Sequence, residues 1–184
     1  MFALMTAALL LPGCGGAAKY EEDVSRYRES LCNVSGISMT AEIRADYGER
    51  VLDYTLHYEE NLDGNTVEVL LPKLIAGVKA HFPESGGTLE FDGLILETGD
   101  LTSEGMNPIS ALPEIVKSLK SGYLQKMWRE KTDDGYALVL QLAISDTSSQ
   151  TIWIDSAGMI PIYAEIKNDN RTVFFCTITD WTVM

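Results

Sequence analysis

An uninterrupted two-residue alternation near the start of this 184-residue chain constrains its fold more than any other feature. The alternating apolar positions are Ile37, Met39, Ala41, Ile43, Ala45 and Tyr47. Polar side chains occupy every position between them. Because successive strand residues point to opposite faces of a sheet, this pattern predicts a strand with one buried and one solvated face.

The same period of two returns along most of the chain. Strands are expected over residues 52–59, 67–71, 74–82, 89–91, 94–97, 123–131, 136–144, 151–155, 159–167 and 172–184. Turn signals separate them, among them Asn61–Asn65 and the Asp92-Gly93 pair. Short connections of this kind predict an antiparallel sheet in meander order, and the long strands favour strong curvature. The fold class is therefore α+β and mainly β.

Two segments have helical spacing instead. Tyr20, Val24, Tyr27 and Leu31 form one apolar stripe, which predicts an amphipathic helix ending near Asn33 and Gly36. Leu112, Ile115, Val116 and Leu119 form a second stripe, which Gly122 terminates. Asn107 and Pro108 suit the start of this helix, but Pro113 could delay its regular part.

The first residues indicate export. Residues 1–11 are apolar and uncharged, and they are too short to span a membrane but fit a secretory signal. Leu11-Pro12-Gly13-Cys14 resembles a bacterial lipobox. We therefore expect a lipoprotein signal peptide over residues 1–13, lipidation at Cys14, a short tether over 14–19 and a folded domain over 20–184. An ordinary signal, or a buried helix that contains a cysteine, is the alternative. Lipidation would anchor the chain on the extracytoplasmic face of the cell membrane.

Charge and motifs exclude several functions. Fourteen Lys and Arg stand against 27 Asp and Glu, a net charge of −13, so nucleic acid is not an expected partner. The sequence lacks the GxSxG, Walker A, dinucleotide and HExxH patterns. His57 and His81 fall on the polar sides of their strands. We expect neither an enzyme nor a metal or cofactor site. Cys32 and Cys176 are expected to be free and buried, although export would permit a disulfide.

The apolar sheet face and the second helix stripe are candidates for a ligand cavity. Small alanines alternate with large side chains there, and a strongly bent sheet under few helices can leave apolar space for an acyl chain. A fully packed core is the alternative. The candidate cavity-lining residues are Met39, Ala41, Ile43, Ala45, Leu52, Tyr54, Leu56, Tyr58, Val67, Val69, Val78, Phe82, Leu112, Ile115, Val116 and Leu119.

Two local segments carry a resemblance to a known family. Trp153–Pro161 (WIDSAGMIP) resembles a "strand, Asp, turn-Gly, x-x-Pro" segment, and Leu89–Leu94 (LEFDGL) resembles an Asp-Gly hairpin, of the lipoprotein-carrier superfamily. The order of elements over residues 20–184 is similar too. This superfamily includes LolA/LolB-like, LppX/LprG-like and germination lipoprotein GerS-like proteins. The resemblance implies an unclosed β-barrel around a hydrophobic cavity, with the helices as a lid.

Two functions follow from that resemblance. The first is non-enzymatic binding of lipid, or of the acyl chains of a lipoprotein, in trafficking at the cell envelope. The second is a protein-interaction module on the same scaffold, with an envelope protein as partner. A GerS-like regulator of a cell-wall enzyme in sporulation or germination is the sharpest form of this alternative.

Overall fold

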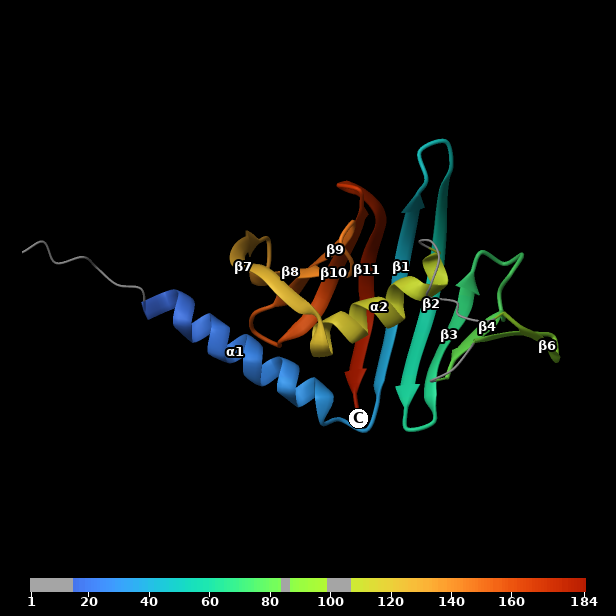
Figure 1. The fold of residues 1–184 in the computed structure, drawn as a ribbon, viewed down its shortest axis with the longest axis horizontal. Coiled ribbons are helices and arrows are strands. Elements are labelled where there is room, and N and C mark those ends of the chain that lie inside the picture. Colours follow the sequence, from blue (N-terminus) through green and yellow to red (C-terminus); the bar gives the residue numbers. More distant parts are fainter. Residues whose placement is uncertain (1–14, 84–86, 99–106) are drawn as a thin grey trace, which may run out of the picture.

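A computed structural model describes residues 15–83, 87–98 and 107–184 (Figure 1). The expected signal peptide and Cys14 lie outside these residues. The described strands are β1 (Ile37–Asp46), β2 (Val51–Asn61), β3 (Gly64–Leu71), β4 (Lys79–Phe82), β5 (Thr88–Phe91), β6 (Leu94–Glu97), β7 (Tyr123–Thr132), β8 (Gly135–Ala143), β9 (Ser148–Asp155), β10 (Ile160–Asn168) and β11 (Arg171–Val183). They form one antiparallel sheet of 11 strands, in the order β6-β5-β4-β3-β2-β1-β11-β10-β9-β8-β7. Two helices accompany them, α1 (Gly15–Cys32) and α2 (Pro108–Ser121).

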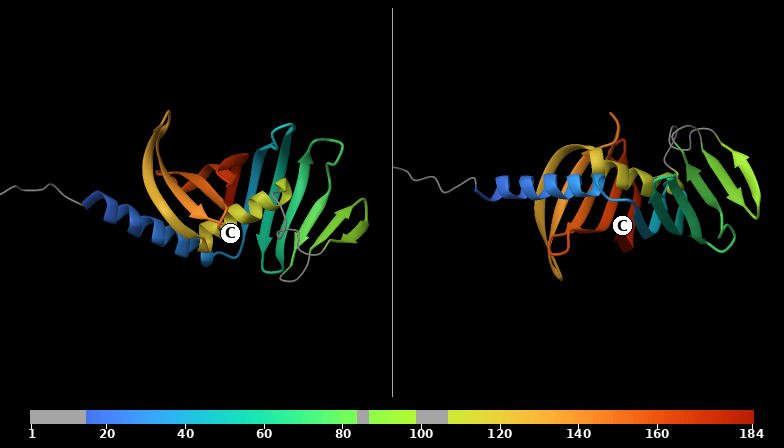
Figure 2. Two further views of the ribbon diagram at one scale, coloured as in Figure 1. Left: turned by 45° about the horizontal axis from the view of Figure 1, so that its top comes forward. Right: turned by 90° about the horizontal axis from the view of Figure 1, so that it is seen from below.

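The sheet is strongly curved and does not close (Figure 2). Strand β1 lies between β2 and β11, so the last strand of the chain pairs with the first. The two ends of the strand order, β6 and β7, remain separate edges of the described sheet. The expected α+β, mainly β architecture, an unclosed barrel with an N-terminal and an inserted helix, is confirmed.

In strand β1 the apolar positions of the alternation are the buried positions. Ile37, Met39, Ala41, Ile43 and Ala45 are all buried on the concave face, whereas Glu42 and Arg44 between them are exposed on the convex face. Pairing extends both rows across the neighbouring strands, because Ile43 lies opposite Tyr54 of β2 and Cys176 of β11.

Helix α2 begins where its capping residues predict. The Asn107 side chain accepts a hydrogen bond from the Ser110 backbone N–H at 2.9 Å, and Pro108 occupies the first turn. The helix is continuous through Pro113, so the regular part is not delayed to that residue. Proline has a helical φ angle, and its missing N–H deprives only one carbonyl, that of Ile109, of its usual donor.

The segment after β3 differs from the expected strand over 74–82. Residues 72–78 turn instead, with the Ile75 N–H donating to the Pro72 carbonyl at 3.1 Å, and β4 begins only at Lys79. Two residues cause this. Pro72 has no N–H for a strand ladder, and Gly77 has a φ of +88°, a left-handed conformation that suits glycine.

Helix α1 begins at Gly15, within the segment expected to be a tether. Its Val24 and Leu31 side chains are buried, and it packs against α2. The Arg28 guanidinium donates to the backbone carbonyls of Leu119, at 2.9 Å, and of Gly122 at the end of α2. These bonds pair carbonyls that a helix end leaves without intrahelical donors.

The two cysteines of the described chain are both free, as expected. Cys176 is buried, but the expectation that Cys32 is buried is wrong, since it is exposed. Cys32 is the last residue of α1 and lies outside the apolar stripe, which ends at the buried Leu31. Its thiol reaches the Lys120 carbonyl at 3.8 Å.

Candidate functional site: a groove beside the inserted helix

Helix α2 covers the concave face of the sheet with its apolar stripe (Figures 1 and 2). Leu112, Ile115 and Leu119 have no exposed surface, and Val116 is 1% exposed. They join the concave-face side chains of the sheet in one hydrophobic cluster. The sequence pattern thus brings a helix stripe and a strand face together although they are far apart along the chain.

The structure places the candidate cavity-lining residues as follows. All except Leu52 belong to this hydrophobic cluster, with Tyr54, Val78 and Phe82 at its half-buried margin. Leu52 shares the concave face, because it lies opposite Ala45, yet it is 43% exposed. It is close to the β1–β2 turn, where the neighbouring Tyr47 and Val51 are exposed as well.

A groove of about 710 Å³ opens between α2 and the paired ends of β2, β3 and β4. Its apolar side chains are Tyr58, Leu62, Phe82, Pro83, Pro113 and Val116. Three of them, Tyr58, Phe82 and Val116, are among the candidate residues. Polar side chains form the rim, and they are Glu60, Asn61, Asp63, Asn65, Glu114, Lys117, Lys120 and Ser121. The groove therefore combines an apolar base with a polar, mixed-charge entrance.

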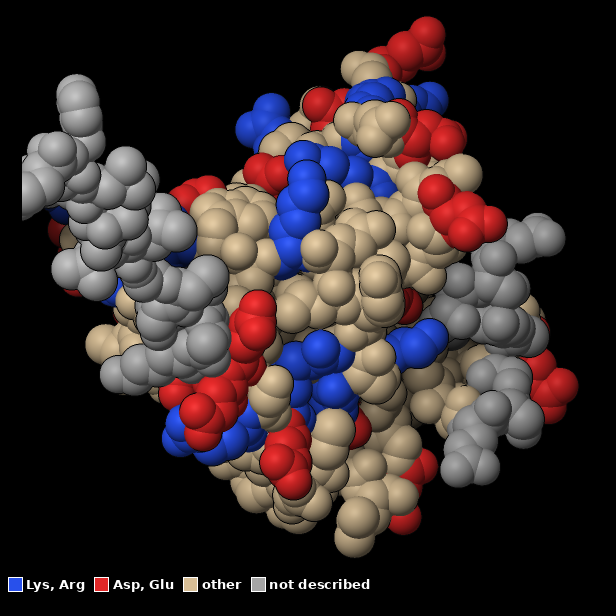
Figure 3. Space-filling view, turned by 60° about the vertical axis from the view of Figure 1, so that its left-hand side comes forward, with Lys and Arg blue, Asp and Glu red and all other residues tan. Residues whose placement is uncertain are grey.

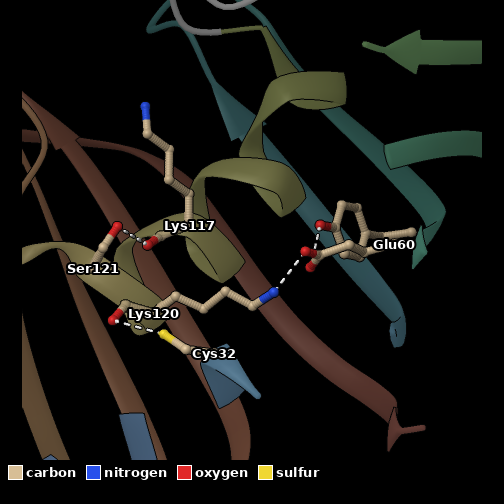
Figure 4. A network of polar contacts seen from close by, with 6 residues as sticks. Cys32, Glu60, Lys117, Lys120 and Ser121 are labelled. Atoms are coloured by element: carbon tan, nitrogen blue, oxygen red, sulfur yellow. Dashed lines mark hydrogen bonds and ion pairs between the residues drawn. The ribbon is translucent and has the colours of Figure 1, made fainter. Parts of the chain in front are cut away.

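An ion pair crosses this groove (Figure 4). The Lys120 ammonium of α2 lies 2.6 Å from the Glu60 carboxylate of β2, and the two side chains are only 20% and 23% exposed. The Tyr58 hydroxyl donates to the other Glu60 oxygen at 3.1 Å. Burial, followed by the nearby Glu60 charge, raises the pKa of Tyr58 above its ordinary range, so it stays a donor. These contacts attach α2 to the sheet at the groove entrance.

Two polar atoms inside the protein were missed by sequence reasoning. The Gln150 side-chain oxygen and the Tyr27 hydroxyl are buried, with no hydrogen-bond partner among the described residues. Gln150 lies on β9, opposite Leu142 and Ile166, and its amide donates to the Glu114 carbonyl of α2 at 3.5 Å. The sequence DTSSQ was interpreted as a turn, so a buried strand position for Gln150 was not predicted. Buried polar atoms of this kind are uncommon and are available to a bound ligand.

The described residues hold no group of three or more His, Cys, Asp or Glu side chains arranged for a metal ion. The two histidines are half-buried beside hydroxyls, His57 with Thr40 at 3.0 Å and His81 with Thr66 at 3.2 Å. His81 also contacts Glu90 at 3.2 Å. Within the described ranges, no helix is both long and apolar enough to cross a membrane. Figure 3 shows acidic and basic side chains interspersed on one face, without a continuous basic surface.

Comparisons with known proteins agree with the architecture and show the fold alone. No family model and no curated protein sequence matches the chain. Among solved structures, an uncharacterized conserved protein from Thermus thermophilus is similar at a TM-score of 0.56 and 8% identity, covering 90% of this chain and 88% of that chain. A DUF1329 family protein from Desulfovibrio piger is similar at a TM-score of 0.50 and 14% identity, covering 89% and 90%.

A LolA superfamily protein from Nitrosomonas europaea is similar at a TM-score of 0.47 and 11% identity, covering 89% of this chain and 93% of that chain. The architecture that the sequence resemblance implied is present here. It consists of the single unclosed antiparallel sheet and the helix inserted across its concave face.

Proposed function

We propose that this chain binds an amphiphilic lipid, or the acyl chain of a lipoprotein, at the concave face beneath α2, and that it does so without catalysis. The groove beside α2 carries this proposal, because its apolar base continues into the hydrophobic cluster while its rim is polar. Its volume of about 710 Å³ is in the range of small-molecule sites. Each methylene buried there would contribute about 0.8 kcal/mol.

A long acyl chain requires more room than the groove supplies. Leu112, Ile115 and Leu119 fill the space under α2, so the helix has to shift away from the sheet when a chain enters. The Lys120–Glu60 pair and the Arg28 bonds at the end of α2 would be the contacts to break. The buried Gln150 oxygen and Tyr27 hydroxyl would then offer one acceptor and one donor to polar ligand atoms.

The proposal includes attachment to the membrane. Lipidation of Cys14, which the lipobox-like Leu11–Cys14 segment predicts, would hold the domain at the extracytoplasmic face. Helix α1 starts one residue later, and its C-terminal part, at Arg28 and Cys32, contacts the end of α2 (Figure 1). The groove would therefore lie about the length of α1 away from the anchor. A Cys14→Ser chain that still fractionates with membranes would contradict the anchor.

Native mass spectrometry tests the binding. The chain from Gly15 to Met184, which retains every described helix and strand, is purified from bacterial cells and then extracted with organic solvent. We expect added mass that resolves into phospholipid or fatty acid. A clean protein mass, unchanged after incubation with phospholipid vesicles, would contradict the proposal and favour the alternative of an envelope-protein interaction module.

A matched pair of variants locates the ligand. Ser121→Trp places an indole at the rim of the groove, and Ser156→Trp places one in the exposed β9–β10 turn. Ser121→Trp should lower the bound fraction about tenfold, equivalent to about two methylenes of lost burial. Equal binding by both variants would remove the groove as the site.

A further inference from the structure

The convex face of the sheet carries a row of aromatic side chains that the concave-face function does not use. Register places Trp128 of β7 opposite Val139 of β8, Val139 opposite Trp153 of β9, and Trp153 opposite Tyr163 of β10. These side chains therefore share one face. We call Trp128, Trp153 and Tyr163 the aromatic strip.

The aromatic strip is held rigidly. The indole N–H groups of Trp128 and Trp153 donate to the two oxygens of Glu130, at 2.6 and 2.8 Å. The Trp153 and Tyr163 rings are 5.2 Å apart with an interplanar angle of 58°. Ala137 and Val139 on the same face have no exposed surface. The rings are thus fixed before any ligand arrives, which reduces the entropy that binding would cost.

A hollow of about 470 Å³ adjoins the end of this strip. Tyr163 lines it together with Phe175, and the opposite side is formed by Glu42, Arg44 and Asp53. Arg44 lies opposite Phe175 on β11 and Asp53 on β2. Within the described part of the chain, the Glu42, Arg44 and Asp53 side chains make no hydrogen bond or ion pair at all. Two rings and three uncommitted charged groups therefore face one hollow.

The chemistry of the hollow selects its occupant. Strands β1, β2, β10 and β11 line it and are paired on both sides, and β3 reaches it only through its last residue, Leu71. A peptide therefore finds no extended free strand edge for backbone hydrogen bonding. Two carboxylates against one guanidinium disfavour phosphate and nucleic acid. A wholly apolar ligand would leave three charged groups unpaired and desolvated.

A sugar satisfies each of these conditions. A pyranose ring has an apolar C–H face that stacks on aromatic rings, and hydroxyls around it that both donate and accept hydrogen bonds. Carboxylates accept from hydroxyls, and a guanidinium donates to them. We propose that this convex hollow, together with the aromatic strip, is a binding site for an uncharged oligosaccharide, with one ring stacked at Tyr163 and Phe175.

In that complex, Asp53, Glu42 and Arg44 hydrogen-bond the hydroxyls of the ring in the hollow. The next ring stacks along the strip toward Trp153. Glu130 keeps lone pairs beyond those used by the two indoles, so it accepts from a hydroxyl there. The site lies on the face opposite α2, and its occupancy is independent of lipid.

Calorimetric titration tests the site with the full chain, in a detergent without a sugar headgroup. Cellobiose and N,N′-diacetylchitobiose are the probes. We expect saturable binding of at least one, with a Kd of about 1 mM or tighter. Tyr163→Ala and Asp53→Asn should each weaken it about fivefold or more. Tyr123→Ala removes a comparable exposed tyrosine outside the site and should change nothing.

Three results would overturn the proposal. One is the absence of saturable binding for both sugars. A second is binding that survives Tyr163→Ala and Asp53→Asn unchanged. A third is saturable binding of inorganic phosphate that Arg44→Ala abolishes, which would make the hollow an anion site. Ser121→Trp, which blocks the lipid groove, should leave sugar binding intact, so this test and the lipid test fail separately.

Discussion

The concave and convex faces of this sheet are built from the same strands and differ in burial and in charge. On β1, Met39 and Ile43 point into a cluster that α2 covers, whereas Glu42 and Arg44 point away from it. Stability is concentrated on the concave face, where the apolar side chains of α2 and the sheet exclude water. The convex face keeps charged and aromatic groups available to solvent. One period-two sequence thus supplies a hydrophobic interior and a separate surface of charged and aromatic side chains.

The largest difference between the faces is expected in thiol accessibility. In the chain from Gly15, Cys176 points into the concave cluster and Cys32 is exposed at the end of α1. Burial raises the pKa of Cys176 to about 12, and only the thiolate reacts. Cys32 should react fully within the time that leaves Cys176 unlabelled. If Cys176 reacts only on global unfolding, the two rates differ by a factor of about 10³ or more.

Thiol labelling followed by intact-mass measurement checks this comparison. Urea above the unfolding transition serves as the control, since both thiols should then react. If Cys176 reacts in native buffer at a rate close to that of Cys32, the concave face opens without unfolding. That result would break the contrast between a closed interior and an open surface.

The two faces should differ next in how much stability is lost when a side chain is truncated to alanine. Leu112→Ala removes a fully buried side chain from α2 and should lower the free energy of unfolding by about 2–5 kcal/mol. Thr177→Ala on the exposed side of β11 should change it by no more than about 0.5 kcal/mol. Urea unfolding followed by circular dichroism measures both. A loss of unfolding free energy for Leu112→Ala as small as that for Thr177→Ala would mean that the helix contributes little to the fold and is held loosely on the sheet.

The sheet was predictable because its signals are local. The alternation from Ile37 to Ala45 and the stripe of Leu112, Ile115, Val116 and Leu119 each specify their own buried face, and both are confirmed. Only Tyr47, the last position of the alternation, lies beyond β1 and is exposed. For residues 72–78 the same reasoning gave a wrong prediction, because a strand was expected from residue 74 and the structure has a turn. Their apolar residues continue the period of two, but Pro72 and Gly77 impose a turn that outweighs it.

The site was less predictable because it depends on pairings between distant segments. Nothing near Lys120 in sequence indicates that it meets Glu60, and Gln150 looks like part of a polar turn. The Glu130 carboxylate joins indoles from β7 and β9 only through strand register. Apolar periodicity identifies which face is buried, but a groove rim or an aromatic strip requires the sheet order.

The smallest expected effect concerns the contribution of a charged group, Glu130, to stability on the convex face. Hydrogen bonds from Trp153 first and Trp128 second hold the pKa of Glu130 below its ordinary value of 4.5. A carboxyl with a lowered folded-state pKa contributes stability above its unfolded pKa, and that contribution is lost as pH falls through the folded pKa. Because Glu130 is accessible to solvent, we expect Glu130→Gln to cost less than about 1 kcal/mol at pH 7.

Unfolding at a series of pH values measures that cost. The stability difference between the parent chain and Glu130→Gln should be constant from neutral pH down to about pH 5 and should vanish progressively below pH 4.5, where the carboxyl becomes neutral like the amide. Glu59→Gln, at an exposed convex position of β2, is the matched control and should show no such loss. A Glu130→Gln difference close to zero at every pH would mean that the indoles are positioned by packing alone. The aromatic strip would then owe its geometry to the same apolar forces as the concave face.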